Sequence, residues 1–370
     1  MINTSEIIKT KIDSRCCRRK TKHINTVQSI LEECCIELDV DVPELICCDT
    51  LAKNFGAFKL KDKSYIVFDN CLTESLYLFN AIIFTGNNPN DIDKFFYKLF
   101  AEELILNNHL PKGLYFTGKY RDLTFSFDDQ DLNEATKQVS YQIYFLLGHE
   151  ITHLSLANNK LEISSEFKKL VNVAVKLLTR RFINKDRDEQ RILNEITGYF
   201  IKDRTFESID EYVNYLSNDI HYNNFVEECF CDYQGFKLLL EHYSNAEFSI
   251  YSISNALNYL VLQESIRSDL ANGALDVNST SKDAQDTLYF SVLRIQMLLI
   301  ILQMNEIETI GLVYDKTLDC CELTEQLGRF MDMLPDRNIL NELNSNDLPN
   351  IDLKTIKDIL IKQLFYSTTE

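Results

Sequence analysis

Scarce chain-breaking residues constrain this chain more than any other feature of its sequence. Only 10 glycines and 5 prolines interrupt 370 residues, and these two residue types most often end or kink helices. Apolar residues make up 45% of the sequence and charged residues 25%, which is typical of a globular protein with a sizeable core. The length suits one large domain or two ordinary ones. We therefore expect long helices to dominate the fold.

A cluster of short β-type runs precedes the helical part. Residues of high strand propensity group at Glu44–Cys48, Phe55–Leu60 and Ser64–Phe68, and a further strand pair is expected at Gly113–Phe116 and Leu123–Phe127. Apolar residues at helical spacing predict helices over the other segments: Thr26–Leu38, Leu72–Phe84, Asp91–Asn107, Asp131–Leu156 with Asp131 as its N-cap, Ser164–Phe182, Asp188–Ile201, Ile209–Leu216, Phe225–Tyr243, Ser252–Leu270, Ala284–Met304 and Leu353–Leu364. The predicted fold class is α+β and predominantly helical, with a small N-terminal sheet and a helical C-terminal part.

Charge is distributed unevenly along the chain. Residues 1–24 carry a net charge of +5, so the remainder carries −23 of the total of −18. A body this acidic repels phosphates, which argues against a nucleic-acid partner. The basic start could touch RNA or anionic lipid, but a solvated helix or a loose terminus is the favoured interpretation.

Cysteine usage and hydropathy indicate a cytoplasmic protein without a membrane span. No continuous apolar segment of the secretory type opens the chain. The most apolar run, Leu288–Met304, contains Arg294 and is predicted to be a buried helix, since its uninterrupted part is too short to cross a bilayer. The 11 cysteines are odd in number and include four adjacent pairs, so free thiols in a reducing cytosol are expected. The sequence leaves the oligomeric state open.

The motif that carries chemistry is His149-Glu150-Ile151-Thr152-His153, an H-E-x-x-H sequence within a predicted helix. Residues four apart share a helix face, so both imidazoles can bind one ion. Glu150 is one position further round the helix, where it can act as a general base on a metal-bound water. The sequence therefore predicts a zinc site with Glu150 as its catalytic residue.

A third zinc ligand must come from elsewhere in the chain, because catalytic zinc takes three protein ligands and a water. Glu228 and Asp232 lie four apart on a later predicted helix and face the same way. We expect Glu228 to bind the metal and Asp232 to hold the free nitrogen of a ligand histidine. Glu227 is the lesser candidate, and Cys229 with Cys231 is a competing pair of thiolate ligands.

Several nearby residues are candidates for stabilising a reaction intermediate. His221 lies two helical turns before Glu228 and could donate a hydrogen bond to a tetrahedral intermediate, as could Tyr222 or Tyr233. A purely structural role is the alternative for each of them. The remaining histidines have no partner in the sequence and are predicted to be ordinary: His23, His109 and His242.

The motifs together resemble the gluzincin metallopeptidases, in which HExxH is followed by ExxxD, and especially the heat-shock and prenyl-protein-processing peptidases and their soluble relatives. The resemblance spans about Val42 to Arg294 and includes three short segments that look like the family's strand–(N-x-x-A-F)–strand unit: Val42–Asp49, Asn54–Phe58 and Tyr65–Phe68. A weaker resemblance is to bacterial phage-exclusion peptidases. Leu288-Tyr289 stands where the family often has a His-Pro pair, with Arg294 after it.

This resemblance implies a zincin-like domain over residues 25–245, between the basic segment 1–24 and a helical C-terminal extension, 246–370, packed on it. It implies that His149, His153 and Glu228 bind Zn²⁺, that Glu150 is the base and that Asp232 is a supporting residue. The expected function is a zinc-dependent endopeptidase acting on a cytosolic protein or peptide, with Ser64–Phe68 or Phe55–Leu60 pairing with the extended substrate. The alternatives are a non-catalytic helical interaction module and a zinc-binding regulator that has lost hydrolysis.

Overall fold

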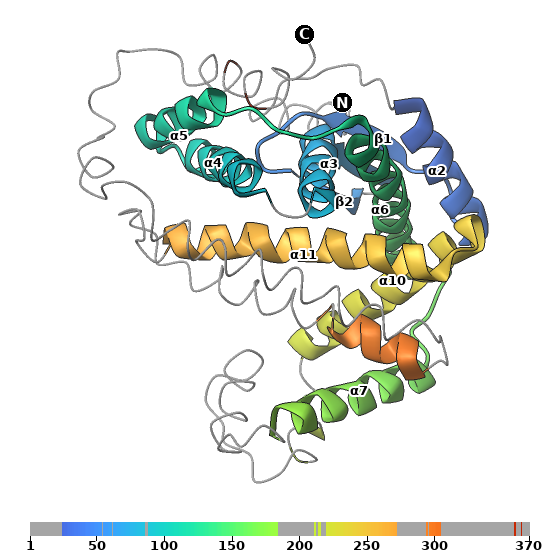
Figure 1. The fold of residues 1–370 in the computed structure, drawn as a ribbon. Helices are drawn as coiled ribbons and strands as arrows, with labels where there is room; N and C mark the ends of the chain where they lie inside the picture. The colour runs from blue at the N-terminus through green and yellow to red at the C-terminus, as the bar shows by residue number, and fades with distance from the viewer. Residues whose placement is uncertain are drawn as a thin grey trace.

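Helices form most of the structure, and one small sheet accompanies them (Figure 1). The computed structural model describes residues 24–183 except 54, 61, 86 and 87, and then 211, 214, 215, 220–271, 294, 296–304, 359 and 364. Its elements are α2 (Ile24–Glu37), β1 (Glu44–Cys48), β2 (Phe55–Leu60), β3 (Lys63–Asp69), α3 (Asn70–Phe84), α4 (Pro89–Leu106), α5 (Leu110–Asp122), α6 (Asp129–Ala157), α7 (Ser165–Ile183), α10 (Ile220–Tyr243) and α11 (Ala246–Ala271). The expectation of a predominantly helical α+β fold is confirmed.

The three strands form one mixed sheet in the order β1-β3-β2. β1 pairs with β3 in parallel, and β2 pairs with β3 antiparallel. β3 is therefore central and its main chain is paired on both sides, so the expectation that Ser64–Phe68 could offer a free edge to a substrate is wrong. β2 is an edge strand, with no second partner among the described strands.

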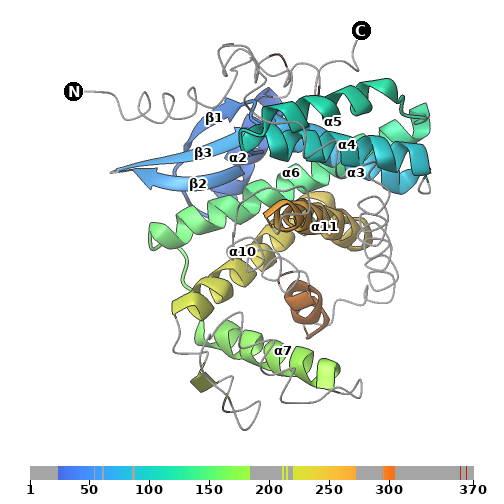
Figure 2. The same ribbon diagram turned by 90° about the vertical axis from the view of Figure 1, so that its left-hand side faces the viewer.

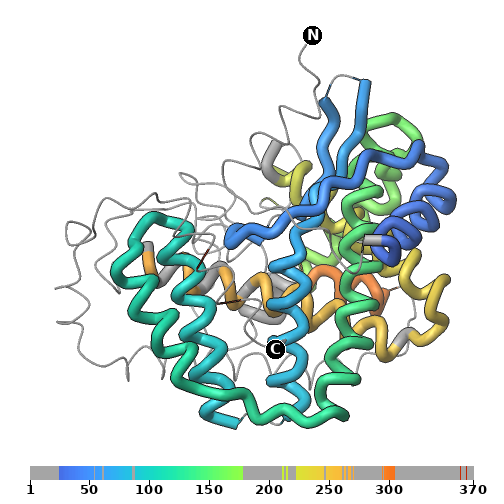
Figure 3. The backbone as a smooth tube through the Cα atoms, turned by 90° about the horizontal axis from the view of Figure 1, so that it is seen from above, coloured from blue at the N-terminus to red at the C-terminus, as the bar shows by residue number. Residues whose placement is uncertain are grey.

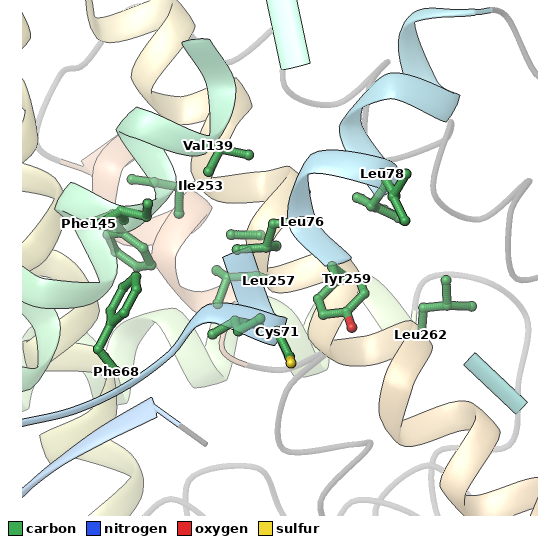
Figure 4. Close-up of a cluster of buried hydrophobic side chains, with 14 of the residues drawn as sticks. Phe68, Cys71, Leu76, Leu78, Val139, Phe145, Ile253, Leu257, Tyr259 and Leu262 are labelled. Atoms are coloured by element: carbon green, nitrogen blue, oxygen red, sulfur yellow. The ribbon is translucent and has the colours of Figure 1, made fainter. Parts of the chain in front are cut away.

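The main hydrophobic core lies where the end of the sheet meets α3, α6 and α11 (Figure 4). Phe68, Phe145 and Leu257 are among its buried members, and Tyr259 is completely buried beside α3. Full burial of one such side chain contributes roughly 1.5–3 kcal/mol to the free energy of folding. α4 and α5 pair with each other on one side of α3, whereas α6 lies on the other side (Figure 3).

The helix α6 lies between the sheet and α10 (Figure 2). The two helices approach closely where Gly148 of α6 meets Gly235 of α10. A Cβ atom added to Gly235 would lie 2.9 Å from the backbone oxygen of Phe145 and 3.1 Å from the backbone nitrogen of His149. This glycine pair therefore lets α10 come close enough for its side chains to meet those of α6.

The start of α6 is fixed by a capping box one turn earlier than its sequence suggested. Asp128 is the N-cap, and its side chain accepts a hydrogen bond from the backbone nitrogen of Asp131, whose side chain bonds back to the N-cap nitrogen. Asp131 is thus the third helical residue rather than the N-cap. At the other end the helix continues to Ala157 and is capped by Asn158.

The expected strand pair at Gly113–Phe116 and Leu123–Phe127 is wrong. Residues 110–122 form α5 instead, and residues 123–128 have no regular secondary structure. The reason is a helical burial pattern in which Leu110, Gly113, Phe116 and Tyr120 are all buried, and the last three of them contact α4. Gly113 looked like a strand boundary, but its missing side chain makes room for Ile105 of α4.

Some predicted segments lie outside the described residues. These are the basic segment 1–24 apart from Ile24, the helices Asp188–Ile201 and Leu353–Leu364 apart from two positions, and the residues Leu288 and Tyr289. Within the predicted helix Ala284–Met304, Arg294 and residues 296–304 are helical. Of the helices that the structure describes, none has both the length and the apolar character needed to cross a bilayer.

Candidate metal centre

One turn of α6 presents both histidines of the HExxH motif on the same face. The Nε2 atoms of His149 and His153 are 3.1 Å apart. His149 is buried, and the side chain of His153 is 22% exposed. The helical spacing of four residues therefore brings the two imidazole nitrogens to one point, as the sequence predicts.

α10 brings a carboxylate to the same point. Glu228 Oε2 lies 3.5 Å from His149 Nε2, and Glu228 Oε1 lies 3.3 Å from His153 Nε2. Ligands bound about 2.0–2.1 Å from a tetrahedral ion lie about 3.3–3.4 Å from one another. The two imidazole nitrogens, 3.1 Å apart, are close to this spacing, and one oxygen of Glu228 faces each of them, so the three side chains converge on a place where one ion could bind.

The other ring nitrogen of each histidine lies beside a carboxylate. His153 Nδ1 lies 2.9 Å from Glu227 Oε1, and His149 Nδ1 lies 2.9 Å from Asp232 Oδ1. A carboxylate beside Nδ1 favours the tautomer that carries its proton there. Both Nε2 lone pairs then face each other and Glu228, an arrangement that either a proton or a metal cation between them would stabilise.

Asp232 and Arg294 form an ion pair beside these residues. The guanidinium of Arg294 donates to both oxygens of Asp232, at 2.9 and 2.7 Å, and also lies 2.9 Å from Glu228 Oε2. Asp232 Oδ1 is shared between Arg294 and His149, and its contact with His149 is not well aligned as a hydrogen bond. Burial raises the pKa of Asp232, but Arg294 and His149 outweigh that effect and hold it below its usual value.

Protons compete for the same position when no metal is bound. Burial alone would lower the pKa of His149, but the carboxylates of Asp232 and Glu228 raise it to about 9. The pKa of His153 is also raised, because Glu228 and Glu227 outweigh its burial. The pKa of Glu228 is lowered by both imidazoles and by Arg294, despite burial. The site is thus strongly attractive to positive charge.

Glu150 lies beside the ligand group and faces the edge strand. Its Oε2 accepts a 2.7 Å hydrogen bond from the backbone nitrogen of Ala57 in β2. Burial raises the pKa of Glu150, although His149 and the Ala57 bond act in the opposite direction. A carboxylate with a raised pKa is a better proton acceptor, which suits a general base.

A cavity of about 580 Å³ opens over these residues between α6 and β2. Along α6 it extends from Phe145 to Ala157. Near Phe145 its wall is apolar and includes Leu72 and Leu257, whereas near the histidines it includes Glu227. The ligand group therefore lies in a cleft that an extended chain could enter.

The candidates for stabilising an intermediate have different positions. The backbone of His221 lies in the first turn of α10, and its side chain is outside what the structure describes. Tyr222 is buried in a second core cluster, where its hydroxyl donates to Asn172. Tyr233 packs against Phe167 of α7. Neither tyrosine belongs to the described lining of the cleft.

The thiolate alternative is not supported by the structure. Cys229 and Cys231 are both buried, and burial raises the pKa of each thiol above its ordinary value. Among the described residues neither joins the converging group of His149, His153 and Glu228. Every described cysteine is a free thiol.

The other histidines lie away from this group. His109 stands at the N-terminus of α5, and His242 stacks on Tyr144 and contacts Glu33. His23 is outside the described residues.

Two contacts at the site have no clear sequence signal. The Glu227–His153 contact depends on how α10 packs on α6, and the Ala57–Glu150 bond depends on where the sheet lies. The ion pair of Arg294 with Asp232 does have a sequence signal, because the resemblance to gluzincins places Arg294 on a helix that follows α10.

In the described part of the chain, His149, His153 and Glu228 are the residues that could hold a metal ion. Comparison with protein-family models, with curated proteins and with solved structures found no match for this chain. Any assignment of function therefore depends on the geometry of this site.

Proposed function

We propose that this chain is a zinc-dependent endopeptidase with a zincin-like catalytic domain. The observation that carries this proposal is the convergence of His149 Nε2, His153 Nε2 and the carboxylate of Glu228 on one point, next to Glu150. Two imidazoles and one carboxylate, with a fourth position open, are a common ligand set of catalytic zinc. Imidazole and carboxylate ligands without thiolate also suit zinc better than copper(I) or an iron–sulfur cluster.

The chain's own residues have defined parts in hydrolysis. Zinc, when bound, lowers the pKa of a coordinated water to about 7 and polarises the scissile carbonyl. Glu150 would take the proton of the attacking water as the new C–O bond forms, and would then pass it to the leaving nitrogen as the C–N bond of the peptide breaks. Its raised pKa and its position beside the cleft support both transfers.

The edge strand β2 supports a peptide substrate. Backbone groups along a strand alternate in direction, and the Ala57 nitrogen faces Glu150 rather than β3. By the same alternation Phe55 and Lys59 also direct their backbone groups to the free edge of β2. An extended substrate can pair with this edge beside the metal, in the manner of an added strand.

The substrate we propose is a cytosolic protein or peptide. The 11 cysteines with four adjacent pairs suit a reducing compartment. The acidic body of the chain disfavours nucleic acid as a partner.

Metal analysis of purified protein tests the first half of the proposal. We expect one zinc per chain in the wild type and almost none in His153→Ala, which loses one of three ligands. Retention of full zinc in His153→Ala would contradict the ligand assignment. Absence of zinc from the wild type would instead favour a non-catalytic interaction module.

Proteomic comparison of cells expressing the wild type and Glu150→Gln tests the second half. Glutamine has nearly the same shape as glutamate but cannot accept the proton of the water. We expect new protein termini with the wild type that are missing with Glu150→Gln, at equal zinc content. Identical termini in the two samples would favour a zinc-binding regulator that has lost hydrolysis.

A further inference from the structure

Each histidine of the candidate metal centre contacts its own carboxylate on α10. The expected support, Asp232, lies beside His149. Glu227 lies beside His153, with its Oε1 2.9 Å from His153 Nδ1 in a well-directed hydrogen bond. His153 is therefore held by a residue that its position in the sequence suggested only as a second-choice ligand.

The geometry excludes Glu227 as a metal ligand. Its oxygen meets Nδ1, the ring nitrogen that faces away from the point where the two Nε2 atoms and Glu228 converge. Glu227 and Glu228 are neighbours in α10, so their side chains leave the helix about 100° apart. Glu228 contacts Nε2 of His153, and Glu227 contacts Nδ1 of the same ring.

We propose that Glu227 is a positioning residue that fixes the tautomer and the ring orientation of His153, an inference that rests on the proposed metal site. By accepting the Nδ1 proton, Glu227 leaves the Nε2 lone pair free for the metal and makes the imidazole more basic. Residues in this role commonly change metal affinity about 10–100-fold when they are removed.

The surroundings of Glu227 differ from those of Asp232 in a way that makes this role testable. The side chain of Asp232 is 1% exposed and paired with Arg294, so its removal disturbs the fold as well as the metal. The side chain of Glu227 is 43% exposed at the rim of the cleft. Replacement of Glu227 therefore leaves no buried charge without a partner, and the variant should fold normally.

The experiment is a competition titration of the full-length protein with zinc and a chromophoric chelator. We expect Glu227→Ala to bind zinc about 10–100-fold more weakly than the wild type. Glu227→Gln should fall between the two, because its amide oxygen can still accept the Nδ1 proton. Glu241→Ala, which removes an exposed glutamate from the same helix, should match the wild type.

Cobalt provides a second measurement that a merely structural residue would not affect. The visible absorption of the Co²⁺-loaded protein reports the geometry of the ligands around the ion. We expect Glu227→Ala to change this spectrum and Glu227→Gln to restore most of it, while the metal-free variants unfold at the temperature of the Glu241→Ala control.

The outcomes separate this inference from the proposed function. A wild type that binds zinc, together with a Glu227→Ala variant of unchanged affinity and unchanged cobalt spectrum, would overturn the role of Glu227 alone. A wild type that binds neither metal would overturn the metal site and the role of Glu227 with it. Weakened binding in Glu227→Ala with recovery in Glu227→Gln would support the positioning role.

Discussion

Asp232 joins the candidate metal centre to Arg294. It is completely buried, and it connects the guanidinium of Arg294 to the imidazole of His149. A buried carboxylate is tolerated only where partners compensate for the water that it has lost. Asp232 therefore affects the folding of the chain and its metal affinity together.

The substitution Asp232→Asn should lower both quantities. Asparagine lacks the charge that pairs with Arg294, so we expect zinc binding about 10–100-fold weaker without being abolished. We expect the metal-free protein to lose about 3–5 kcal/mol of stability, as when one partner of a buried ion pair is removed. Chelator competition and denaturant unfolding measure the two effects, with the exposed Asp62→Asn as the control. Wild-type affinity in Asp232→Asn would contradict the supporting role.

The pKa of His149 predicts how metal binding depends on pH. In the metal-free protein this pKa is about 9, because Asp232 and Glu228 outweigh burial, whereas an unfolded histidine titrates near 6.5. The proton therefore stabilises the metal-free fold below about pH 6.5, and this stabilisation is lost as the pH rises to about 9. A metal must displace the same proton, so its apparent affinity should rise about tenfold per pH unit over that window.

Competition titrations at pH 6.5, 7.5 and 8.5, with a chelator corrected for its own protonation, measure this slope. Thermal unfolding of the metal-free protein over the same range should show the opposite trend, with stability falling as the pH rises. An affinity that is the same at all three pH values would contradict the assigned protonation state of His149.

Local spacing made most of these residues predictable from sequence. His149 with His153 and Glu228 with Asp232 are pairs four residues apart on helices, and a helix places such pairs on one face whatever surrounds it. Glu227 could not be assigned in the same way, because only the crossing of α6 and α10 brings it to His153. The Ala57–Glu150 bond depends on the position of the sheet, and nothing in the local sequence reports that.

At the scale of elements, the crossing of α6 and α10 determines whether the ligands meet. Gly148 and Gly235 allow the two backbones to approach each other closely next to His149. Substituting Gly235→Ala would place a Cβ atom 2.9 Å from the backbone oxygen of Phe145, which cannot move by a simple side-chain rotation. We expect a loss of stability of about 1–3 kcal/mol from overpacking, and weaker zinc binding because the helices separate.

Denaturant unfolding and chelator competition measure both consequences. Gly118→Ala in α5 is a matched control, because a Cβ atom there meets nothing within 4 Å. Alanine in an exposed helical position should stabilise that variant by roughly 0.5–1 kcal/mol. If Gly235→Ala were as stable as the wild type and bound zinc equally well, the close crossing would not be what positions the ligands.

Prediction from sequence succeeded for helices and strands with a clear periodicity of apolar residues. It failed for elements whose structure depends on their packing against other elements. The long helices and all three strands carry clear periodicity, and their positions agree with the structure to within a few residues for most elements. α5 was not predicted because its sequence shows no clear helical pattern of apolar residues. The residues that share its buried face are recognised only once α5 is seen packed on α4. The order of the strands could not be predicted from the sequence either. The sequence therefore did not show that β2 lies at the edge of the sheet and β3 at its centre.

At the scale of the whole molecule, contacts with two helices hold the edge strand over the metal centre. Just before β2, the buried Nζ of Lys53 lies 2.6 Å from Glu102 of α4. At its other end Lys59 donates to Asn158, the C-cap of α6. The chain is thus held to α4 before Ala57 and to the end of α6 after it, and a substrate can pair with β2 without displacing either contact.

We predict that the backbone of a bound peptide-like inhibitor pairs with the free edge of β2, at Phe55, Ala57 and Lys59. Those residues direct their backbone groups away from β3, and the Ala57 nitrogen already has an acceptor in Glu150 that a ligand carbonyl can replace. An ester in place of the inhibitor amide that donates to β2 should weaken binding about 2–10-fold, the equivalent of about 0.5–1.5 kcal/mol for one hydrogen bond. An ester at the neighbouring amide, which faces away from β2, should have little effect. A structure of the complex in which the inhibitor backbone contacts no residue of β2 would show that the strand only covers the core.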